Sequence, residues 1–240
     1  MVWIRRRWKL LLLGVVAAIG IGVVAVPYVY IHFINKPAER LTLANLDKQR
    51  ASDSAAEVGP ASNVAIDGTW TVVAPSTAGY RVKETLNGQD TEGVGRTQTV
   101  DGSFTIAGTR VTAGEFNVDV SSLKSDQTRR DNQVRNRLLE TDEFPVATFV
   151  LDQPISLDAI PDDSVLITST AIGTLSLHGV DKPVTLAIEA RRTGEAIDVL
   201  ASTSITFADY GIENPSVSPF VAVGDIGMLE VQLTLNRAAS

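Results

Sequence analysis

Residues capable of catalysis are sparse in this chain, and their spacing does not assemble a recognisable catalytic set. The 240-residue sequence has no cysteine, which excludes disulfides, thiolate metal sites and cysteine nucleophiles. His32 lies near the end of an apolar N-terminal run and His178 lies among turn-forming residues, so a Ser-His-Asp set cannot be placed. No HExxH, phosphate-binding loop or complete G-x-G-x-x-G occurs, and Gly93-x-Gly95 alone is a weak signal.

Two acidic features remain as candidates for chemistry. Asp162-Asp163 has the character of a turn rather than of a metal-binding pair. Glu84 shares the period-two phase of Tyr80 and Val82, so one interpretation places it inside a sheet, where it would bind a polar head group. The other is a strand-end glutamate that reaches solvent. A carboxylate pair that met inside the barrel with raised pKa values would favour hydrolase activity.

Residues 165–191 indicate internal space rather than reactivity. Residues 165–177 alternate between apolar or small residues and hydroxylated ones, and residues 184–191 alternate in the same way. This pattern predicts two strands, each with one dry face, joined by a turn at residues 178–183. The dry face of the first strand holds three small residues where a filled core would hold large ones: Ser169, Ala171 and Gly173. We therefore expect an unfilled volume there, and we expect Gly173→Leu to fill it.

The sequence from residue 67 onward repeats this alternation with turn residues at short intervals. Residues 196–207 and 229–235 alternate without error, residues 146–157 are predicted to form one strand, and a phase slip around Gly114 predicts a β-bulge. No periodic helices alternate with the strands. The pattern favours an all-β fold in which an antiparallel sheet closes into a barrel, because closure removes edge strands. A β-sandwich is the alternative.

Residues 126–140 form the one predicted helical insertion. Its apolar stripe consists of Val134 and Leu138, which is too thin for a core helix. One interpretation is a solvated helix docked by these two side chains. The other is a basic mouth that meets an anionic head group or a membrane surface. The insertion carries four basic side chains: Arg129, Arg130, Arg135 and Arg137.

The N-terminus predicts a membrane location. Residues 10–34 contain no charged side chain, and 25 residues at about 1.5 Å each exceed a hydrocarbon core of about 30 Å. The basic residues before this run predict a cytoplasmic N-terminus and an extracytoplasmic remainder. A cleaved signal peptide is the alternative. Small residues within the run would allow a homodimer of membrane helices, although such residues are common in membrane helices: Gly14, Ala18 and Gly22.

Charge and composition divide the chain. Residues 1–34 form the predicted tail and anchor, 35–66 a polar linker in which 40–47 could be a short helix, and 67–237 the barrel. Beyond residue 34 the chain holds 17 basic and 28 acidic residues. This acidic balance disfavours nucleic acid as a partner.

Three groups of motifs, in order, resemble the YceI-like domain family. They are VDVSSL at 118–123 with RD, LL and EFPVATF at 130–131, 138–139 and 143–149; GTLSLHGVDKPVTL at 173–186; and SITFADYGI at 204–212 with VGD at 223–225. The resemblance covers about residues 67–237. It implies an extended lipocalin-like barrel that binds a long isoprenoid or similar lipid in its lumen.

The function expected from residues and resemblance together is non-catalytic binding of a lipid, with no cofactor or metal. Two alternatives stay open: a structural or interaction module with a packed barrel, and a hydrolase acting on a lipid-like substrate. The predicted ligand-binding residues point inward and are apolar, aromatic or small: Tyr80, Phe104, Phe116, Phe149, Ala171, Gly173, Leu175, Leu186, Val199, Ile205 and Phe207.

Overall fold

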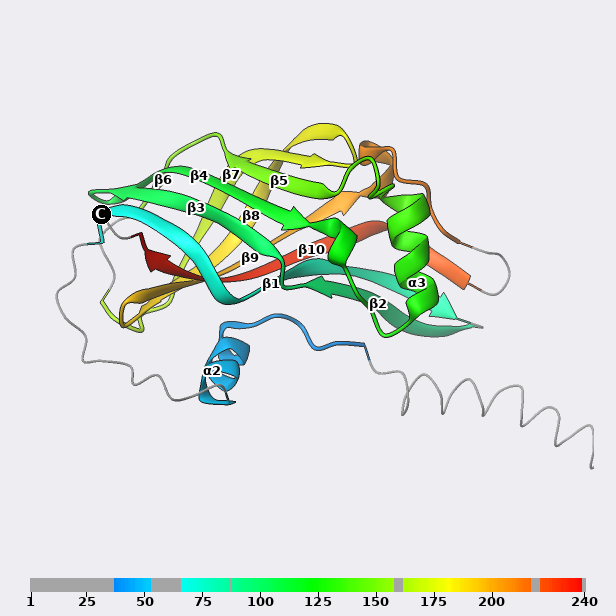
Figure 1. The fold of residues 1–240 in the computed structure, drawn as a ribbon, viewed down its shortest axis with the longest axis horizontal. Helices are drawn as coiled ribbons and strands as arrows, with labels where there is room; N and C mark the ends of the chain where they lie inside the picture. The colour runs from blue at the N-terminus through cyan, green and yellow to red at the C-terminus, as the bar shows by residue number, and fades with distance from the viewer. Residues whose placement is uncertain (1–36, 53–65, 87, 158–161, 217–220, 239–240) are drawn as a thin grey trace, which may run out of the picture.

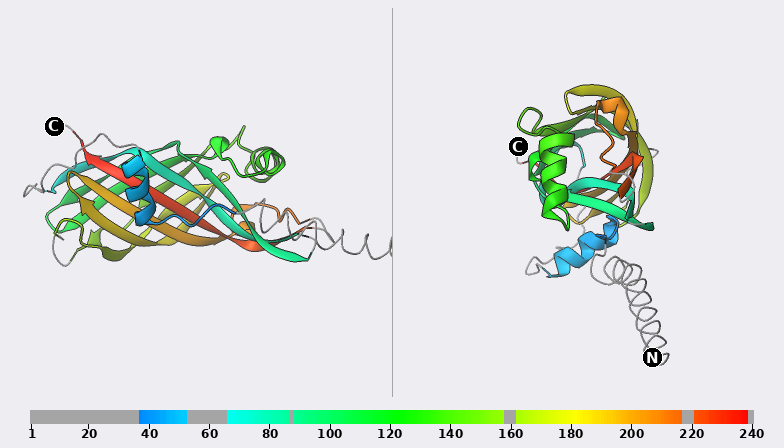
Figure 2. Two further views of the ribbon diagram at one scale, coloured as in Figure 1. Left: turned by 90° about the horizontal axis from the view of Figure 1, so that it is seen from below. Right: turned by 90° about the vertical axis from the view of Figure 1, so that its right-hand side faces the viewer.

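The computed structural model describes residues 37–52, 66–86, 88–157, 162–216 and 221–238. Ten antiparallel strands form one sheet that curls into a barrel (Figures 1 and 2). The strands are β1 Gly68–Leu86, β2 Gln89–Thr97, β3 Val100–Ala107, β4 Arg110–Asp119, β5 Val146–Leu151, β6 Ile155–Ser156, β7 Ile167–Leu177, β8 Val180–Thr193, β9 Ala196–Thr206 and β10 Val221–Arg237. The helical elements are α2 Leu43–Ser52, η2 Val120–Ser122, α3 Thr128–Gln133, η3 Val134–Leu138 and η4 Phe207–Tyr210.

Eight of the strands close the barrel. Their order is β1-β3-β4-β5-β7-β8-β9-β10, and β10 pairs with β1 from Trp70 opposite Arg237 to Leu86 opposite Val221. The predicted closed antiparallel barrel is therefore confirmed, and the β-sandwich alternative is wrong. The two remaining strands extend the wall locally. β2 replaces β3 as the partner of β1 beyond Ala78, and β6 pairs with the start of β4.

The two ends of the barrel differ in their covering. At one end, which we call the α3 end, lie η2, α3, η3 and η4 together with the β1–β2 and β7–β8 turns (Figure 1). At the opposite end, the far end, lie the β3–β4 turn at Gly108, the β8–β9 turn at Gly194 and the start of β1. The short helical insertion predicted at residues 126–140 is confirmed and lies at the α3 end.

The alternation that predicted the longest strand pair is confirmed, but the turn between them is shorter than expected. β7 ends at Leu177 and β8 begins at Val180, so the turn consists of His178 and Gly179. Their φ angles are 52° and 71°, and two such residues suit the twist of an antiparallel hairpin. Pro183, predicted to lie in the turn, is therefore inside β8 opposite Thr174.

Two further local predictions are refined by the structure. The predicted bulge is confirmed and lies at Thr112, because Thr105 pairs with Ala113 while Ile106 pairs with Val111. The single strand predicted at residues 146–157 is wrong. It is divided into β5 and β6, and between them Asp152 donates its backbone N–H to the carbonyl oxygen of Ile172.

Some of the N-terminal predictions concern residues outside the described ranges, and others concern residues that the structure describes. Residues 1–34, with the predicted anchor, His32 and the small residues of a helix pair, lie outside the described residues. No helix in the described part of the chain has the length and apolar character needed to span a bilayer. Residues 37–52, within the predicted polar linker, pack on the outer wall of the barrel, and we call them the strap (Figure 1). The short helix expected near residues 40–47 corresponds to α2, which contributes buried Leu43 and Leu46.

The strap explains why polar residues on the outer face of β9 and β10 are buried. The alternation predicted that these side chains point away from the lumen into solvent. They do point away from it, but they are at most 4% exposed because the strap forms a second layer over this wall: Asp198, Glu230, Gln232 and Thr234.

Candidate functional site

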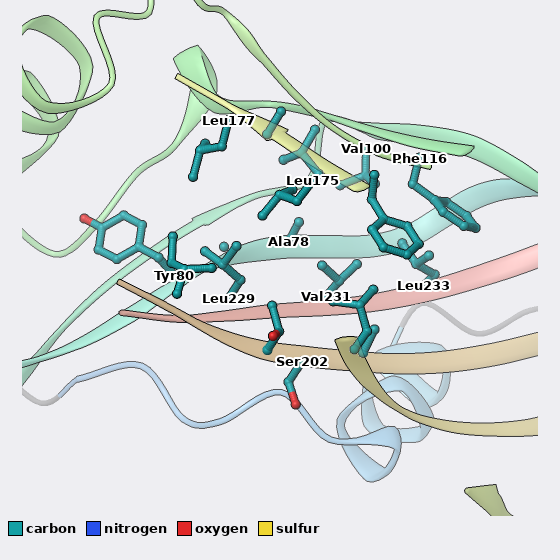
Figure 3. A pocket seen from close by; sticks show the side chains of 18 of the residues that line it. Ala78, Tyr80, Val100, Phe116, Leu175, Leu177, Ser202, Leu229, Val231 and Leu233 are labelled. Carbon is teal, nitrogen blue, oxygen red and sulfur yellow. The ribbon is translucent and has the colours of Figure 1, made fainter. Parts of the chain in front are cut away.

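The barrel interior contains a cavity of about 670 Å³. Small-molecule pockets in proteins usually have volumes of about 300–1,000 Å³. Apolar side chains from every strand of the closed barrel contribute to its walls, as Figure 3 shows for Ala78, Leu175 and Val231. The interior is therefore hollow, which contradicts the alternative of a barrel packed solid.

Ten of the eleven residues predicted to bind the ligand border this cavity, and their contact with a ligand stays a prediction. Tyr80 and Phe116 lie toward opposite ends of the lumen (Figure 3). The ten residues come from β1, β3, β4, β5, β7, β8 and β9 and from the first residue of η4: Tyr80, Phe104, Phe116, Phe149, Ala171, Leu175, Leu186, Val199, Ile205 and Phe207.

Gly173 does not border the cavity. Its position in β7 is occupied on the inner side by the ring of Phe149, and a Cβ there would also meet the carbonyl oxygen of Val150. The glycine thus allows an aromatic ring to lie flat on the neighbouring strand. A leucine at this position would displace the wall itself, so Gly173→Leu is not a clean test of the lumen. Ser169 and Ala171, the other two small residues, do border the cavity.

Three further residues line the cavity that were not predicted as ligand contacts, although their spacing in the sequence indicates an inward face. Leu229, Val231 and Leu233 were predicted to face inward on the last strand but were not named as ligand contacts, and all three border the cavity (Figure 3). Their period-two spacing is the same signal that identified the residues on β7 and β9.

The far end of the lumen is filled by a hydrophobic cluster. Trp70 is 1% exposed, and its indole N–H donates to the carbonyl oxygen of Ile66 at 2.8 Å. Six more buried side chains complete the cluster: Ile66, Phe104, Ile106, Ile197, Leu233 and Leu235. A ligand in the lumen would therefore meet a mostly apolar floor at this end, where Arg191 and Arg192 of β8 also border the cavity.

The α3 end of the lumen carries a buried ion pair. Glu84 points inward, which decides between the two interpretations of this residue, and its carboxylate accepts from the Arg130 guanidinium at 2.9 Å. Both side chains are largely buried, at 8% and 13% exposure. Asp126 binds the same guanidinium. Burial alone would lower the pKa of Arg130, but the Glu84 and Asp126 carboxylates hold it above its ordinary value.

This ion pair has two consequences for chemistry. Glu84 meets a cation rather than a second carboxylate, so this residue does not form the carboxylate pair that would favour hydrolase activity. Gly93 lies directly beneath the Glu84 carboxylate, where a Cβ would collide with it. Gly93 and Gly95, a weak nucleotide-binding signal in the sequence, are therefore positions that receive inward side chains of β1.

Tyr80 adds a neutral polar group beside the pair. Its ring lies over Gly95, and its hydroxyl points toward the α3 end (Figure 3). Burial raises the pKa of Tyr80, the Arg130 charge lowers it, and the Glu84 carboxylate raises it, with a net shift above the ordinary value. The hydroxyl is therefore protonated at neutral pH and able to donate to a ligand head group.

The helical insertion covers this end of the cavity. Val134 is buried and Leu138 packs beside it, so the docking predicted for these two side chains is confirmed. Gln127, Arg129 and Gln133 border the cavity from the same segment. The remaining arginines bind outer partners: Arg135 donates to Asn132 at 2.9 Å, and Arg137 to Glu213 at 3.4 Å.

The other candidate residues have structural roles. His178 bonds to the backbone oxygen of Tyr210 at 2.8 Å and to Glu140 at 3.1 Å, and its ring meets Phe144 edge-on. Asp163 lies in a turn and accepts from the backbone N–H of Gly194, as its turn character predicted. Within the described ranges, no cluster of three or more His, Cys, Asp or Glu residues has the geometry to hold a metal ion.

The sequence and the architecture are both similar to those of known proteins. The family model for the YceI-like domain matches residues 70–235. A UPF0312 protein of Shewanella denitrificans is 35% identical over 131 residues, which cover 50% of this chain and 64% of that protein. A UPF0312 protein of Vibrio vulnificus is 29% identical over 136 residues, covering 53% of this chain and 68% of the relative.

Two solved structures share the fold. A polyisoprenoid binding domain from Saccharophagus degradans, implicated in plant cell wall breakdown, superposes with a TM-score of 0.58 at 17% identity, covering 72% of this chain and 99% of that domain. BcnA of Burkholderia cenocepacia gives a TM-score of 0.53 at 18% identity and covers 68% and 98%, respectively.

Proposed function

The chain belongs to the family of YceI-like domains, and from this premise we propose that its barrel binds a long-chain isoprenoid or related lipid. Binding is non-covalent and occurs in the lumen, at the outer face of a membrane, for storage, shielding or transfer. The observation that carries the proposal is the apolar cavity of about 670 Å³ enclosed by the closed sheet. The polyisoprenoid-binding description of one structural neighbour supports the same class of ligand.

Elementary energetics supports a binding role without catalysis. Burial of about 400 Å² of hydrocarbon at about 25 cal/mol/Å² offers about 10 kcal/mol before the costs of ordering. Micromolar affinity requires about 8 kcal/mol. The burial of apolar surface is therefore large enough to account for micromolar affinity. The polar groups at the α3 end serve to orient the head group.

A substitution that fills the lumen tests this function. Ala171 is 3% exposed on the inner face of β7, and the adjacent Ile172 points outward at 39% exposure. We expect Ala171→Phe to reduce the lipid that co-purifies with the barrel by at least about tenfold, because the ring takes volume that the ligand needs. Mass spectrometry of an organic extract measures the lipid.

Ile172→Phe is the matched control, because it places the same ring on the outer wall. Circular dichroism confirms that both variants are folded, and Leu175→Phe provides a second lumen variant if Ala171→Phe is not. Full lipid content in a folded lumen variant would contradict the proposed site. An extract of the unmodified barrel without any lipid would contradict the proposed function.

A further inference from the structure

We propose that the strap holds the α3 end of the barrel against the lipid bilayer, so that ligand passes directly between the membrane and the lumen. This inference rests on the proposed lipid-binding function. The partner is the lipid surface itself, and the interaction surface is the rim of the barrel at the α3 end. Three features support the inference: the direction in which the strap runs, the buried charged network that it contacts and the short chain that precedes it.

The strap has a defined direction along the barrel. Near its start, the carbonyl oxygen of Ala38 accepts from Arg81 Nη2 at 2.8 Å. Farther on, the carbonyl oxygen of Thr42 accepts from the Gln232 side chain, which lies opposite Thr77 of β1. At Leu43 the carbonyl oxygen accepts from Arg191. The strap therefore runs toward the far end, and its first residues point toward the α3 end (Figures 1 and 2).

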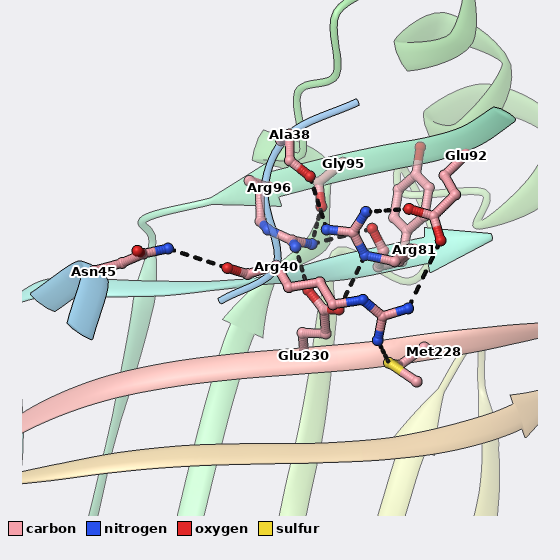
Figure 4. A network of polar contacts seen from close by, with 10 residues as sticks. Ala38, Arg40, Asn45, Arg81, Glu92, Gly95, Arg96, Met228 and Glu230 are labelled. Carbon is pink, nitrogen blue, oxygen red and sulfur yellow. Dashed lines mark hydrogen bonds and ion pairs between the residues drawn. The ribbon is translucent and has the colours of Figure 1, made fainter. Parts of the chain in front are cut away.

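The start of the strap contacts a charged network on the barrel wall whose central side chains are buried (Figure 4). Arg81 is 5% exposed and binds Glu230 at 3.1 Å and Glu92 at 2.6 Å, while Arg96 binds the second oxygen of Glu230. Arg40 of the strap reaches Glu92 at 3.8 Å and the sulfur of Met228. Buried charges require a complete set of partners, and the strap carbonyl supplies one of them. The strap is thus part of the barrel wall rather than a loose tether.

The chain before the strap is too short to let the barrel stand away from a membrane. Three residues separate Ala38 from Ile34, the last residue of the apolar run, and the four steps from Ile34 to Ala38 span at most about 14 Å. β1 continues five residues beyond Arg81, to Leu86, which is about 17 Å toward the α3 end. With the apolar run in the bilayer and the strap in place, the rim of β1, β2 and β10 must reach the lipid surface.

The rim has chemistry that fits this contact. Ile226 is the most exposed of the large hydrophobic side chains in the described residues, at 60%, and it lies on the same outer face as Met228, closer to the rim. Leu86 and Val221 pair at the rim and also border the cavity. Apolar side chains therefore lie both on the outer wall beside the strap and at the rim of the cavity.

The absence of cysteine makes the orientation directly measurable with the full chain in vesicles of phosphatidylcholine and phosphatidylglycerol. Single cysteines replace three exposed residues: Asn136→Cys at the α3 end, Glu195→Cys at the far end and Thr170→Cys on the outer wall of β7. Each carries an environment-sensitive fluorophore, and the vesicles contain a head-group-labelled quencher lipid.

We expect quenching at position 136 to exceed that at positions 195 and 170 at least threefold. Equal quenching at 136 and 195, as for a barrel lying on its side, would overturn the proposed orientation. Lipid extraction from the same samples separates the two proposals. Bound lipid with equal quenching refutes the orientation alone, whereas oriented quenching without bound lipid refutes the lipid-binding function.

A spacer tests whether the orientation serves ligand transfer. Ten Gly/Ser residues inserted between Lys36 and Pro37 add about 17 Å of flexible reach while the strap keeps its contacts. We expect loading of a fluorescent prenyl lipid from vesicles to slow at least fivefold, with the final bound amount unchanged. An unchanged loading rate would overturn direct transfer. An equal spacer inserted between Glu57 and Val58, after the strap, is the control, and we expect it to leave the rate unchanged.

Discussion

Two ion pairs of the same chemical type lie in opposite environments at the α3 end. Arg130 and Glu84 are buried in the lumen, whereas Arg137 and Glu213 are 60% and 75% exposed. Removing one partner of a buried pair leaves an uncompensated charge and costs about 3–5 kcal/mol, while an exposed pair contributes at most about 1 kcal/mol. We therefore expect Arg130→Met to lower the free energy of unfolding far more than Arg137→Met, as measured by urea denaturation. Similar losses in both variants would contradict this difference in environment.

Tyr80 gives a prediction about alkaline pH. Its pKa in the folded state lies above the value of about 10 in the unfolded chain, so the folded barrel keeps a proton that the unfolded chain loses. This contribution to stability is complete below about pH 10 and is lost as the pH rises above it. We expect Tyr80→Phe to flatten the decline in unfolding free energy between about pH 10 and 11 by up to about 1.4 kcal/mol. An unchanged slope would show that the phenol is not buried as described.

The small residues show that a sequence reveals which face of a strand a side chain occupies but not whether that position leaves space. Alternation correctly placed Ala171 and Gly173 on the inner face of β7. Whether such a residue leaves space depends on its cross-strand neighbours. Ala171 borders the cavity, but Gly173 receives the ring of Phe149, just as Gly93 and Gly95 receive Glu84 and Tyr80. A single sequence does not reveal which neighbour fills a small position, because that depends on strand register.

The strap packs on one wall of the barrel, and we expect a substitution in its buried contact to have a local effect. Leu46 is fully buried between α2 and the wall. Leucine-to-alanine changes in such sites cost about 2–5 kcal/mol. We expect Leu46→Ala to accelerate amide hydrogen exchange in residues 43–49 roughly 100-fold, which corresponds to about 3 kcal/mol, while exchange in β7 and β8 is unchanged.

Leu166→Ala is the control for this experiment, because Leu166 is 53% exposed and its truncation removes little packing. Uniform acceleration across all strands in Leu46→Ala would mean that strap and barrel unfold as one unit. No acceleration in the strap would mean that Leu46 does not hold it in place.

Strands were predictable from this sequence, whereas the strap contact was not. In a strand with one buried face, apolar residues recur at every second position. This alternation is visible in the sequences of β7, β8, β9 and β10 without knowledge of their partner strands. The strap is mostly polar, and the face it covers carries Glu230 and Gln232, which are typical of a solvated surface. Its docking depends on matched hydrogen bonds between distant segments, and these leave no local periodicity.

At the scale of the whole molecule, ligand and stability are linked. A lipid that binds the folded barrel and not the unfolded chain adds about 2.7 kcal/mol at a concentration of 100 times Kd. For a domain of this size we expect delipidation to lower Tm by about 5–10 °C and added lipid to restore it, as measured by calorimetry. Ala171→Phe is the control, because its filled lumen should show neither change. A Tm that does not respond to delipidation would contradict binding in the core.

Closure of the sheet was predictable because the sequence from residue 67 onward predicts many half-buried strands and no periodic helices that alternate with them. The way the barrel is completed at the α3 end was not. Between Gln89 and Gly95, β2 pairs with β1 on one side, and no other strand in the described part of the chain pairs with its second edge. The helical insertion lies there instead, through the Arg130–Glu84 pair and the contacts of Val134.

A helical segment beside β2, in place of a further strand, makes this the part of the wall that we expect to open most easily. Widening the barrel anywhere else breaks a cooperative ladder of backbone hydrogen bonds, which requires something close to global unfolding. Widening it beside β2 separates one ion pair and a few apolar side chains. Under the proposed function, we therefore expect exchange of the lipid to cross a lower barrier than unfolding of the barrel, so that the residence time of the lipid and the lifetime of the fold are set by different contacts.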